Sequence, residues 1–219
     1  MHLSDLEALE KHLGKLYFSI VHSILSWTSI KWHPVVFTFK VSARGKDKKH
    51  FQEQCDLLGP LDIKAISKFD ATATTHVITN KRNTPQTLQA LVHGKYVIDE
   101  SFIKELEYVT AAGNLDEPES LSRLEMDFDG AWPDPLKYLA AAIRQADSQA
   151  ELHFKPEPNR STVFRGYTFV MFDKKQYDSL QPPLEGGGGI VKLHELKLGQ
   201  GTAADIIRYM KQELSLIHI

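Results

Sequence analysis

The stretch 75-THVITNKRNTPQTLQALVHGKYVIDESFIKEL-106 decides the fold of this chain. Its β-branched opening, residues 75–79, predicts a short strand. A Thr-Pro pair then suits the start of a helix, and the glycine at 94 suits its end. Residues 95–98 predict the next strand, and the aspartate at 99 opens a further helix. Strands that alternate with helices in this way indicate a mostly parallel sheet with helices on both faces.

The same alternation precedes this stretch. Residues 35–41 predict a first strand, and apolar side chains at helical spacing in residues 46–58 predict a helix that a Gly-Pro pair ends. Residues 61–66 predict the second strand. We therefore expect residues 34–112 to fold as one unit. Its single expected core consists of Val36, Phe37, Phe51, Ile63, Val77, Leu88, Leu91 and Phe102.

Residues 113–162 differ in composition from the residues before them. They are acidic and rich in proline and glycine, which predicts a linker with one short helix at 136–146. From residue 163 the strand–helix–strand pattern returns. This internal repeat predicts a second, partial unit of the same kind over residues 163–219.

Four consecutive glycines, at 186–189, stand inside this second unit. They follow the predicted helix that Asp173 opens and precede the predicted strand at 190–196. A phosphate-binding loop needs the opposite order, strand then glycines then helix, because only a helix N-terminus offers unpaired N–H groups and a positive dipole. The glycine run is therefore predicted to be structural.

The bulk composition excludes several classes of protein. The 219 residues are 42% hydrophobic and 25% charged, as in a soluble globular protein. A net charge of −2 gives no global positive field for nucleic-acid phosphates, so we do not expect direct DNA binding. The single cysteine, Cys55, excludes an internal disulfide and a cysteine-clustered zinc site, and it fits a reducing compartment. The apolar stretch at 16–27 is too short and interrupted to span a bilayer.

Several segments resemble one family of interaction domains. The run HGKYVIDESFIKEL (93–106) resembles a BRCT domain, with Phe102 in the place where many such domains carry Trp. The segments 75–98 and 163–180 are similar to the two BRCT segments of the nibrin family in a fungal-type version. DFDGAWPDP (127–135) resembles the linker between them, and IKWHPVVFTF (30–39) resembles the junction with an FHA domain.

The resemblance covers about residues 30–212 and implies an α/β fold. We expect a BRCT-type parallel four-stranded sheet flanked by helices over residues 34–112, followed by a second, truncated BRCT-like unit over 163–219. Residues 1–33 are expected to be a remnant of an N-terminal FHA-type domain. The sequence therefore resembles a fragment of such a protein.

The resemblance also implies a phosphate-binding site. BRCT domains bind phosphoserine or phosphothreonine through a hydroxyl at the end of the first strand, a neighbouring backbone N–H, and a lysine at the start of the second helix. The lysine position falls on an uncharged residue, for which the preceding loop offers two cations. The candidate phosphate-binding residues are Ser42, Gly45, Lys81, Arg82 and Gln86, with Thr38 as a second choice for the hydroxyl. The alternative is a solvated NKRN loop that binds no ligand.

Two classes of function follow from these observations. The first is a non-enzymatic scaffold that binds phosphorylated proteins in DNA double-strand-break sensing, repair and checkpoint signalling. The resemblance implies a nuclear location and a place in the MRN complex, whose nuclease and ATPase subunits contact regions that this chain does not include. It implies no cofactor, no metal, no catalytic residue and no membrane.

The second class is an α/β nucleotide-binding or hydrolase-like enzyme domain. The loop after the first strand, 40–49, holds one glycine where dinucleotide-binding proteins use three. Neither a nucleophile elbow, a P-loop nor a zinc-binding HExxH motif is present. A third possibility, a direct DNA-end binder, would depend on the small basic clusters at 43–49 and 80–83.

Overall fold

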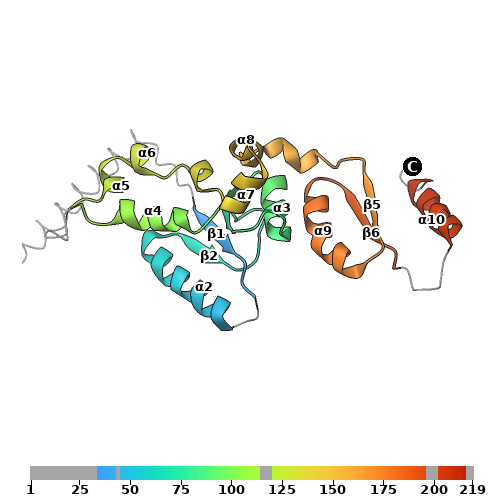
Figure 1. The fold of residues 1–219 in the computed structure, drawn as a ribbon, viewed down its shortest axis with the longest axis horizontal. Coiled ribbons are helices and arrows are strands. Elements are labelled where there is room, and N and C mark those ends of the chain that lie inside the picture. The colour runs from blue at the N-terminus through green and yellow to red at the C-terminus, as the bar shows by residue number, and fades with distance from the viewer. Residues whose placement is uncertain (1–33, 43–44, 114–119, 196–201, 216–219) are drawn as a thin grey trace, which may run out of the picture. The chain divides into compact units, whose positions relative to one another are not determined.

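The structure is a computed structural model that describes residues 34–42, 45–113, 120–195 and 202–215 (Figure 1). The predicted FHA-type remnant at 1–33 lies outside the described residues. Residues Val35–Ile219 form one compact unit.

A four-stranded sheet is the centre of this unit. Its strands are β1 (Val36–Phe39), β2 (Lys64–Ile66), β3 (His76–Ile78) and β4 (Tyr96–Ile98). All neighbouring strands are parallel, and their order in the sheet is β2-β1-β3-β4. The predicted α/β class with a parallel sheet is confirmed. Each strand is shorter than predicted by one to three residues at an end.

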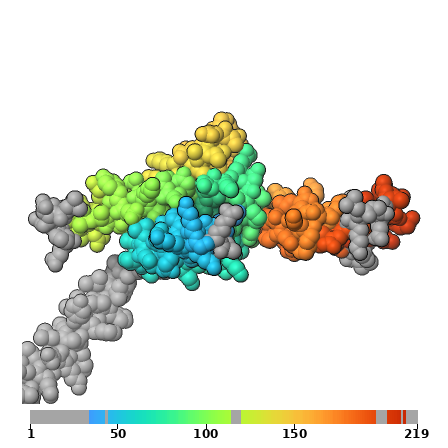
Figure 2. Space-filling view, turned by 60° about the horizontal axis from the view of Figure 1, so that its bottom comes forward, coloured from blue at the N-terminus to red at the C-terminus, as the bar shows by residue number. Residues whose placement is uncertain are grey.

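Helices α2 (Gly45–Leu58) and α4 (Ser101–Thr110) cover one face of the sheet. Their side chains lie next to one another in the space-filling view, α2 in blue to cyan and α4 in light green (Figure 2). Phe37 and Phe102 are fully buried in this layer, where their rings meet edge to face at 5.9 Å. Phe51 packs against the same layer, and Leu58 is fully buried in it. The predicted place of Phe102 in the core is thus confirmed.

Helix α3 (Pro85–Val92) covers the other face of the sheet. Thr84 caps it by accepting a hydrogen bond from the Thr87 N–H at 3.1 Å, as the Thr-Pro pair predicted. Gly94 follows with φ +61°, a conformation that glycine adopts without steric cost. The predicted inward side of α3 is confirmed in part, since Val92 is buried and Leu91 packs against the buried cluster, whereas Leu88 is only half-buried and Ala90 is fully buried.

The second face is completed by the segment that the sequence predicted to be a linker. It forms short helices: α5 (Arg123–Met126), α6 (Phe128–Ala131), η2 (Pro135–Tyr138), α7 (Ala141–Ala146), α8 (Ala150–Phe154) and η3 (Pro158–Thr162). Leu139 and Ile143 are fully buried in one cluster with Val77, Val97 and Ala90. Figure 1 shows α7 and α8 beside α3. The expected single core is therefore two cores, one on each face, and the second needs residues 139–154.

The predicted helix at 136–146 is broken into η2 and α7. The carbonyl of Tyr138 accepts a hydrogen bond from the Asp99 N–H at 2.8 Å, which ties η2 to the end of β4. Leu139 and Ala140 then adopt extended backbone, and both side chains are buried. Burying these two side chains against the sheet stabilises the fold more than one further helical turn would.

The repeat in the second half is also present. Strands β5 (Thr168–Met171) and β6 (Ile190–Leu193) pair in parallel, and helix α9 (Lys174–Gly186) connects them. Asp173 caps α9 by accepting a hydrogen bond from the Gln176 N–H at 2.8 Å, as predicted. The glycine run lies at the C-terminal end of α9, so its predicted structural role is confirmed. Helix α10 (Ala203–Ser215) follows.

Helix α9 packs against α3, and Gly186 of α9 lies at this contact. A Cβ atom built on Gly186 would lie 2.6 Å from Nε2 of His93. A side chain at position 186 would therefore require the His93 ring to move.

Candidate functional site

The strand order marks one edge of the sheet as the place for a ligand. The chain leaves β1 toward β2 in one direction and leaves β3 toward β4 in the other, so the connections diverge between β1 and β3. Ligands of open parallel sheets bind in the crevice at the carboxyl ends of such strands. A cleft lies at this edge. It is lined by residues 39–42 after β1, residues 78–81 after β3, Thr84, residues 99–101 after β4, and Asp47, His50 and Phe51 of α2.

Ser42 is one of the hydroxyl residues that line the cleft. It lies three residues after the end of β1, and its Oγ donates a hydrogen bond to the carboxylate of Asp47 in the first turn of α2. The carboxylate orients the hydroxyl and also places a negative charge beside it. A phosphate at this position would have to share the Ser42 proton with Asp47 and would be repelled by it.

Lys81 lines the same cleft, in a loop that two threonines hold in place. Its N–H donates to the Thr79 hydroxyl at 3.1 Å, and its carbonyl accepts from the Thr87 hydroxyl at 3.2 Å. Because Thr87 is fully buried in α3, the loop is anchored to the core. A cation with a fixed backbone loses less conformational freedom when it binds an anion.

The β4 side of the cleft is acidic. Asp99 accepts hydrogen bonds from the N–H and the hydroxyl of Ser101 and so caps the start of α4. Glu100 reaches across to α2, where its Oε1 lies 3.0 Å from Nε2 of His50. Both partners of this pair are about half exposed, at 44% for His50 and 55% for Glu100.

The structure does not bring all the predicted phosphate-binding residues together. Ser42 and Lys81 line the cleft, whereas Gly45, Arg82 and Gln86 are not among the described residues that line it. The Gln86 amide donates instead to the carbonyl of Ser67 at 3.4 Å, in the connection between β2 and β3. Gly45 begins α2, and a Cβ atom there would meet no atom within 4 Å.

Arg82 lies near an acidic group of α7 and α8. A hydrogen bond from His153 and one from the Gln149 backbone hold the pKa of Asp147 below its ordinary value, and the positive charge of Arg82 adds to this shift. The second-choice hydroxyl, Thr38, is fully buried and exchanges a hydrogen bond with Thr74 at 2.8 Å. It is a structural group of the sheet.

Sequence reasoning missed the acidic half of the cleft. Asp47 stands among lysines in the run GKDKK, so the run suggested a basic cluster. Asp99 was expected only as a helix start, and Glu100 was not considered. A signal in the sequence could have located them. The carboxyl ends of β1, β3 and β4 share one edge of a parallel sheet, so acidic residues near these ends are expected to lie close together.

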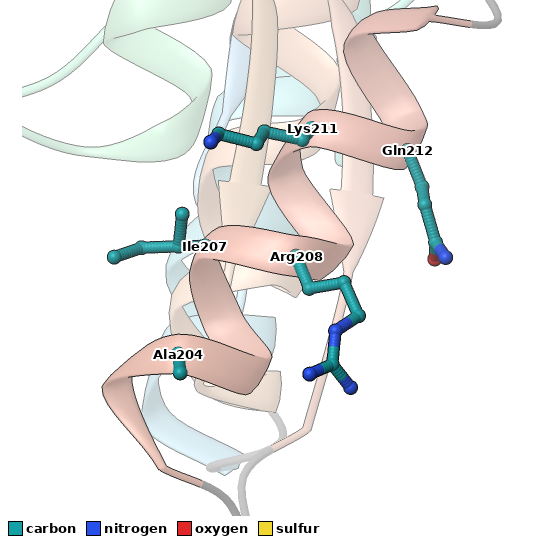
Figure 3. A pocket seen from close by; sticks show the side chains of 5 residues that line it. All are labelled: Ala204, Ile207, Arg208, Lys211 and Gln212. Atoms are coloured by element: carbon teal, nitrogen blue, oxygen red, sulfur yellow. The ribbon is translucent and has the colours of Figure 1, made fainter.

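A second hollow lies along α10 and is lined by Ala204, Ile207, Arg208, Lys211 and Gln212. In Figure 3, Ile207 and Lys211 point to one side of the helix, and Arg208 and Gln212 point to the other. Side chains that diverge from one helix do not converge on a ligand, so this hollow is not the candidate site.

In the ranges that the structure describes, no three His, Cys, Asp or Glu side chains are grouped so that they could hold a metal ion. None of the described helices has the length and the apolar character to cross a membrane.

Residues 158–214 match the model of the second BRCT domain on the Nijmegen syndrome breakage protein. This range contains β5, α9, β6 and nearly all of α10.

Several solved structures are similar to the chain. The structure of the S. pombe Nbs1-Ctp1 complex matches at 17% identity over 80% of this chain and 48% of that chain, with a TM-score of 0.45. The S. pombe Brc1 BRCT5-BRCT6 domains match at 14% identity over 82% of this chain and 73% of theirs, with a TM-score of 0.43. Rad4 BRCT1,2 in complex with a Crb2 phosphopeptide matches at 13% identity over 82% of each chain, with a TM-score of 0.31. The chain spans about half the length of the chain that it matches in the Nbs1-Ctp1 complex, at 48%.

These TM-scores lie below 0.5, so the classification depends on the strand order and on the family match. A four-stranded parallel sheet in the order β2-β1-β3-β4, with α2 and α4 on one face and α3 on the other, defines a BRCT-type domain. The match of residues 158–214 to the second BRCT domain of the Nijmegen syndrome breakage protein supports the nibrin-like tandem BRCT region that the sequence predicted.

Proposed function

We propose that this chain is a non-enzymatic interaction module that binds phosphorylated proteins in the response to DNA double-strand breaks. The observation that carries the proposal is the match of residues 158–214 to the second BRCT domain of the Nijmegen breakage protein, next to a first BRCT-type unit with a polar cleft. Its place would be the nucleus, within the MRN complex. Contacts to the nuclease and ATPase subunits would involve regions outside this chain.

The cleft offers the donors that a phosphate needs. The Ser42 hydroxyl and the Lys81 ammonium line it together, and Asn80 adds an amide beside them. Hydrogen bonds from a cation to a phosphate dianion are about twice as strong as those between neutral groups. The first BRCT unit would therefore hold the phosphorylated side chain at the ends of β1 and β3. A phosphopeptide is also the ligand in the solved Rad4 complex.

The nucleotide-binding alternative has less support. A helix that binds phosphate needs unpaired N–H groups and positive potential in its first turn. The first turn of α2 carries Asp47, whose carboxylate opposes a diphosphate and a phosphopeptide alike, so it does not separate the two functions. The segment after β1, residues 40–49, holds one glycine where dinucleotide-binding proteins use three, which favours the interaction module.

The test is binding of the whole chain to peptide pools. Fluorescently labelled pools with a central phosphoserine or phosphothreonine and random flanks are compared with the same pools without phosphate. We expect binding of the phosphorylated pools only, weakened by Lys81→Gln and unchanged by Lys175→Gln, an exposed lysine of α9 remote in sequence from the cleft. Equal binding of both pools would contradict the proposal. A thermal shift with ATP or NAD that exceeds the shift with phosphopeptide would favour the enzyme alternative.

A further inference from the structure

The charges that line the cleft differ along the edge of the sheet. At the ends of β1 and β3 stand Ser42, Asn80 and Lys81, whose side chains can donate hydrogen bonds, together with Asp47, which accepts the Ser42 hydroxyl. Two further carboxylates, Asp99 and Glu100, stand at the end of β4. Since β3 lies between β1 and β4, these two carboxylates are two strands away from Ser42.

This separation restricts the ligand. Three carboxylates, those of Asp47, Asp99 and Glu100, line the cleft beside only two lysines, Lys40 and Lys81. A phosphate alone would meet a surface whose acidic groups oppose it. A ligand that carries a phosphate at one end and a positive charge at the other would satisfy both sides.

Glu100 is the acidic group best placed to meet such a charge. Asp47 already accepts the Ser42 hydroxyl, and Asp99 already caps α4. The partner of Glu100 is His50, a half-exposed imidazole at 3.0 Å. A lysine or arginine of a ligand can pair with Glu100, beside His50 or in its place. The hydrogen bonds of Asp99 at the start of α4 stay intact.

The geometry of the sheet sets the spacing. Neighbouring strands lie about 4.8 Å apart, so the ends of β1 and β4, two strands away from each other, are separated by about 10 Å. An extended peptide advances about 3.3 Å per residue. The positive residue should therefore stand about two or three positions from the phosphorylated one.

From this arrangement we infer that the cleft recognises a phosphoserine or phosphothreonine together with a lysine or arginine two or three positions away, with Glu100 as the residue that reads the positive charge. The inference rests on the proposed function and adds the class of peptide that the site selects. Exposed ion pairs contribute about 0.2–1 kcal/mol, so the preference for the basic residue should be about 1.5-fold to fivefold. It should decrease as salt rises.

The experiment compares four sets of peptide pools on the whole chain. Each pool has a central phosphothreonine or threonine, and positions two and three on both sides are either arginine or alanine. Affinities are measured for the unsubstituted chain, for Glu100→Gln, and for Glu53→Gln as a control. Glu53 also pairs with His50, at 3.9 Å, but is not among the described residues that line the cleft.

We expect the phosphorylated arginine pool to bind more tightly than the phosphorylated alanine pool. Glu100→Gln should abolish this difference, and Glu53→Gln should preserve it. Phosphate-dependent binding without an arginine preference would overturn the inference and leave the proposed function intact. So would an arginine preference that survives Glu100→Gln. Binding that ignores phosphate in every pool would overturn the proposed function, and the inference with it.

Discussion

The imidazole of His76 lies flat against the ring of Tyr96, with ring centroids 4.9 Å apart and an interplanar angle of 16°. It also stacks on Phe102 at 5.7 Å, so an ionisable side chain stands inside the aromatic core. Its Nδ1 lies 2.9 Å from the Thr75 hydroxyl, whereas its Nε2 has no hydrogen-bond partner among the described residues. Burial lowers the pKa of His76 to about 3.

Acid should therefore destabilise the fold through His76. The pKa of this group is about 3 in the folded chain and about 6.5 in the unfolded one, so the unfolded state binds the proton first as pH falls. The stability that the neutral imidazole provides is complete above pH 6.5 and is lost as the pH falls toward 3. At pH 5 the loss is about 2 kcal/mol. His76→Phe should remove this part of the pH dependence, measured as urea midpoints between pH 7 and pH 5.

Tyr96→Phe is the matched control, because it keeps the stacked ring and leaves His76 in place. It should lose stability between pH 7 and pH 5 as the unsubstituted chain does. If His76→Phe shows the same loss as Tyr96→Phe, the acid sensitivity belongs to other groups.

Phe102 should be the most sensitive position of α4. Its ring is fully buried and meets the rings of Phe37 and Trp132 edge to face, at 5.9 and 6.2 Å. Truncation of a buried aromatic side chain costs about 3–5 kcal/mol. We expect Phe102→Ala to lower the free energy of unfolding by this amount, measured by urea denaturation. Tyr108→Ala, in the same helix but 54% exposed, should cost less than about 1 kcal/mol, and equal losses would contradict the packing of α4.

The parts of the fold that local chemistry decides could be predicted from the sequence. Thr84, Gly94 and Asp173 mark helix ends through their own side chain or backbone conformation, and all three act as predicted. The role of residues 139–154 could not be predicted. Leu139 and Ile143 pack against strands that lie more than forty positions earlier in the sequence. The residues around them are acidic and rich in proline, a composition that predicted a linker.

The candidate site was predictable in part for a similar reason. Ser42 lies three residues after the end of β1 and Lys81 three residues after the end of β3, so the strand pattern placed them in one cleft. The direction of Gln86 depends on the rotation of α3. That rotation is set by Thr87, which turns inward to hold the Lys81 carbonyl and the Thr84 hydroxyl. The pattern of apolar residues does not predict a hydrogen bond of this kind, so it could not predict the rotation of α3.

Residues 139–154 should be part of the first folding unit. Ile143 is fully buried against the α3 face of the sheet, whereas Leu152 is 65% exposed. Deleting a buried isoleucine to alanine costs about 2–5 kcal/mol. We expect Ile143→Ala to lower the urea midpoint of the first unit and Leu152→Ala to leave it within error. An Ile143→Ala chain in which amides of β3 and β4 exchange as slowly as before would show that the segment is a passive linker.

One glycine of the run at 186–189 should be irreplaceable for conformational reasons. Gly188 has φ +83°, where a Cβ atom clashes with the backbone at a cost of about 1–2 kcal/mol. We expect Gly188→Ala to raise amide exchange rates in β5 and β6 by about fivefold to thirtyfold. Gly59→Ala is the control, because a Cβ atom there meets nothing within 4 Å and its φ is not positive. Equal effects of the two substitutions would show that the run is only a flexible spacer.

Two substitutions can show whether the phosphate binds next to Lys81 or next to Gln86. Lys81 lines the cleft with Ser42, whereas the Gln86 amide donates to the Ser67 carbonyl outside the described lining. A hydrogen bond from a charged donor contributes about 1.5–3 kcal/mol, against about 1 for a neutral one. Lys81→Gln should therefore weaken binding of the phosphothreonine pool about twofold to thirtyfold, and less at high salt. Gln86→Lys should leave the affinity unchanged, because its new charge would stand beside Ser67. If Gln86→Lys tightens binding and Lys81→Gln has no effect, the phosphate lies at the start of α3.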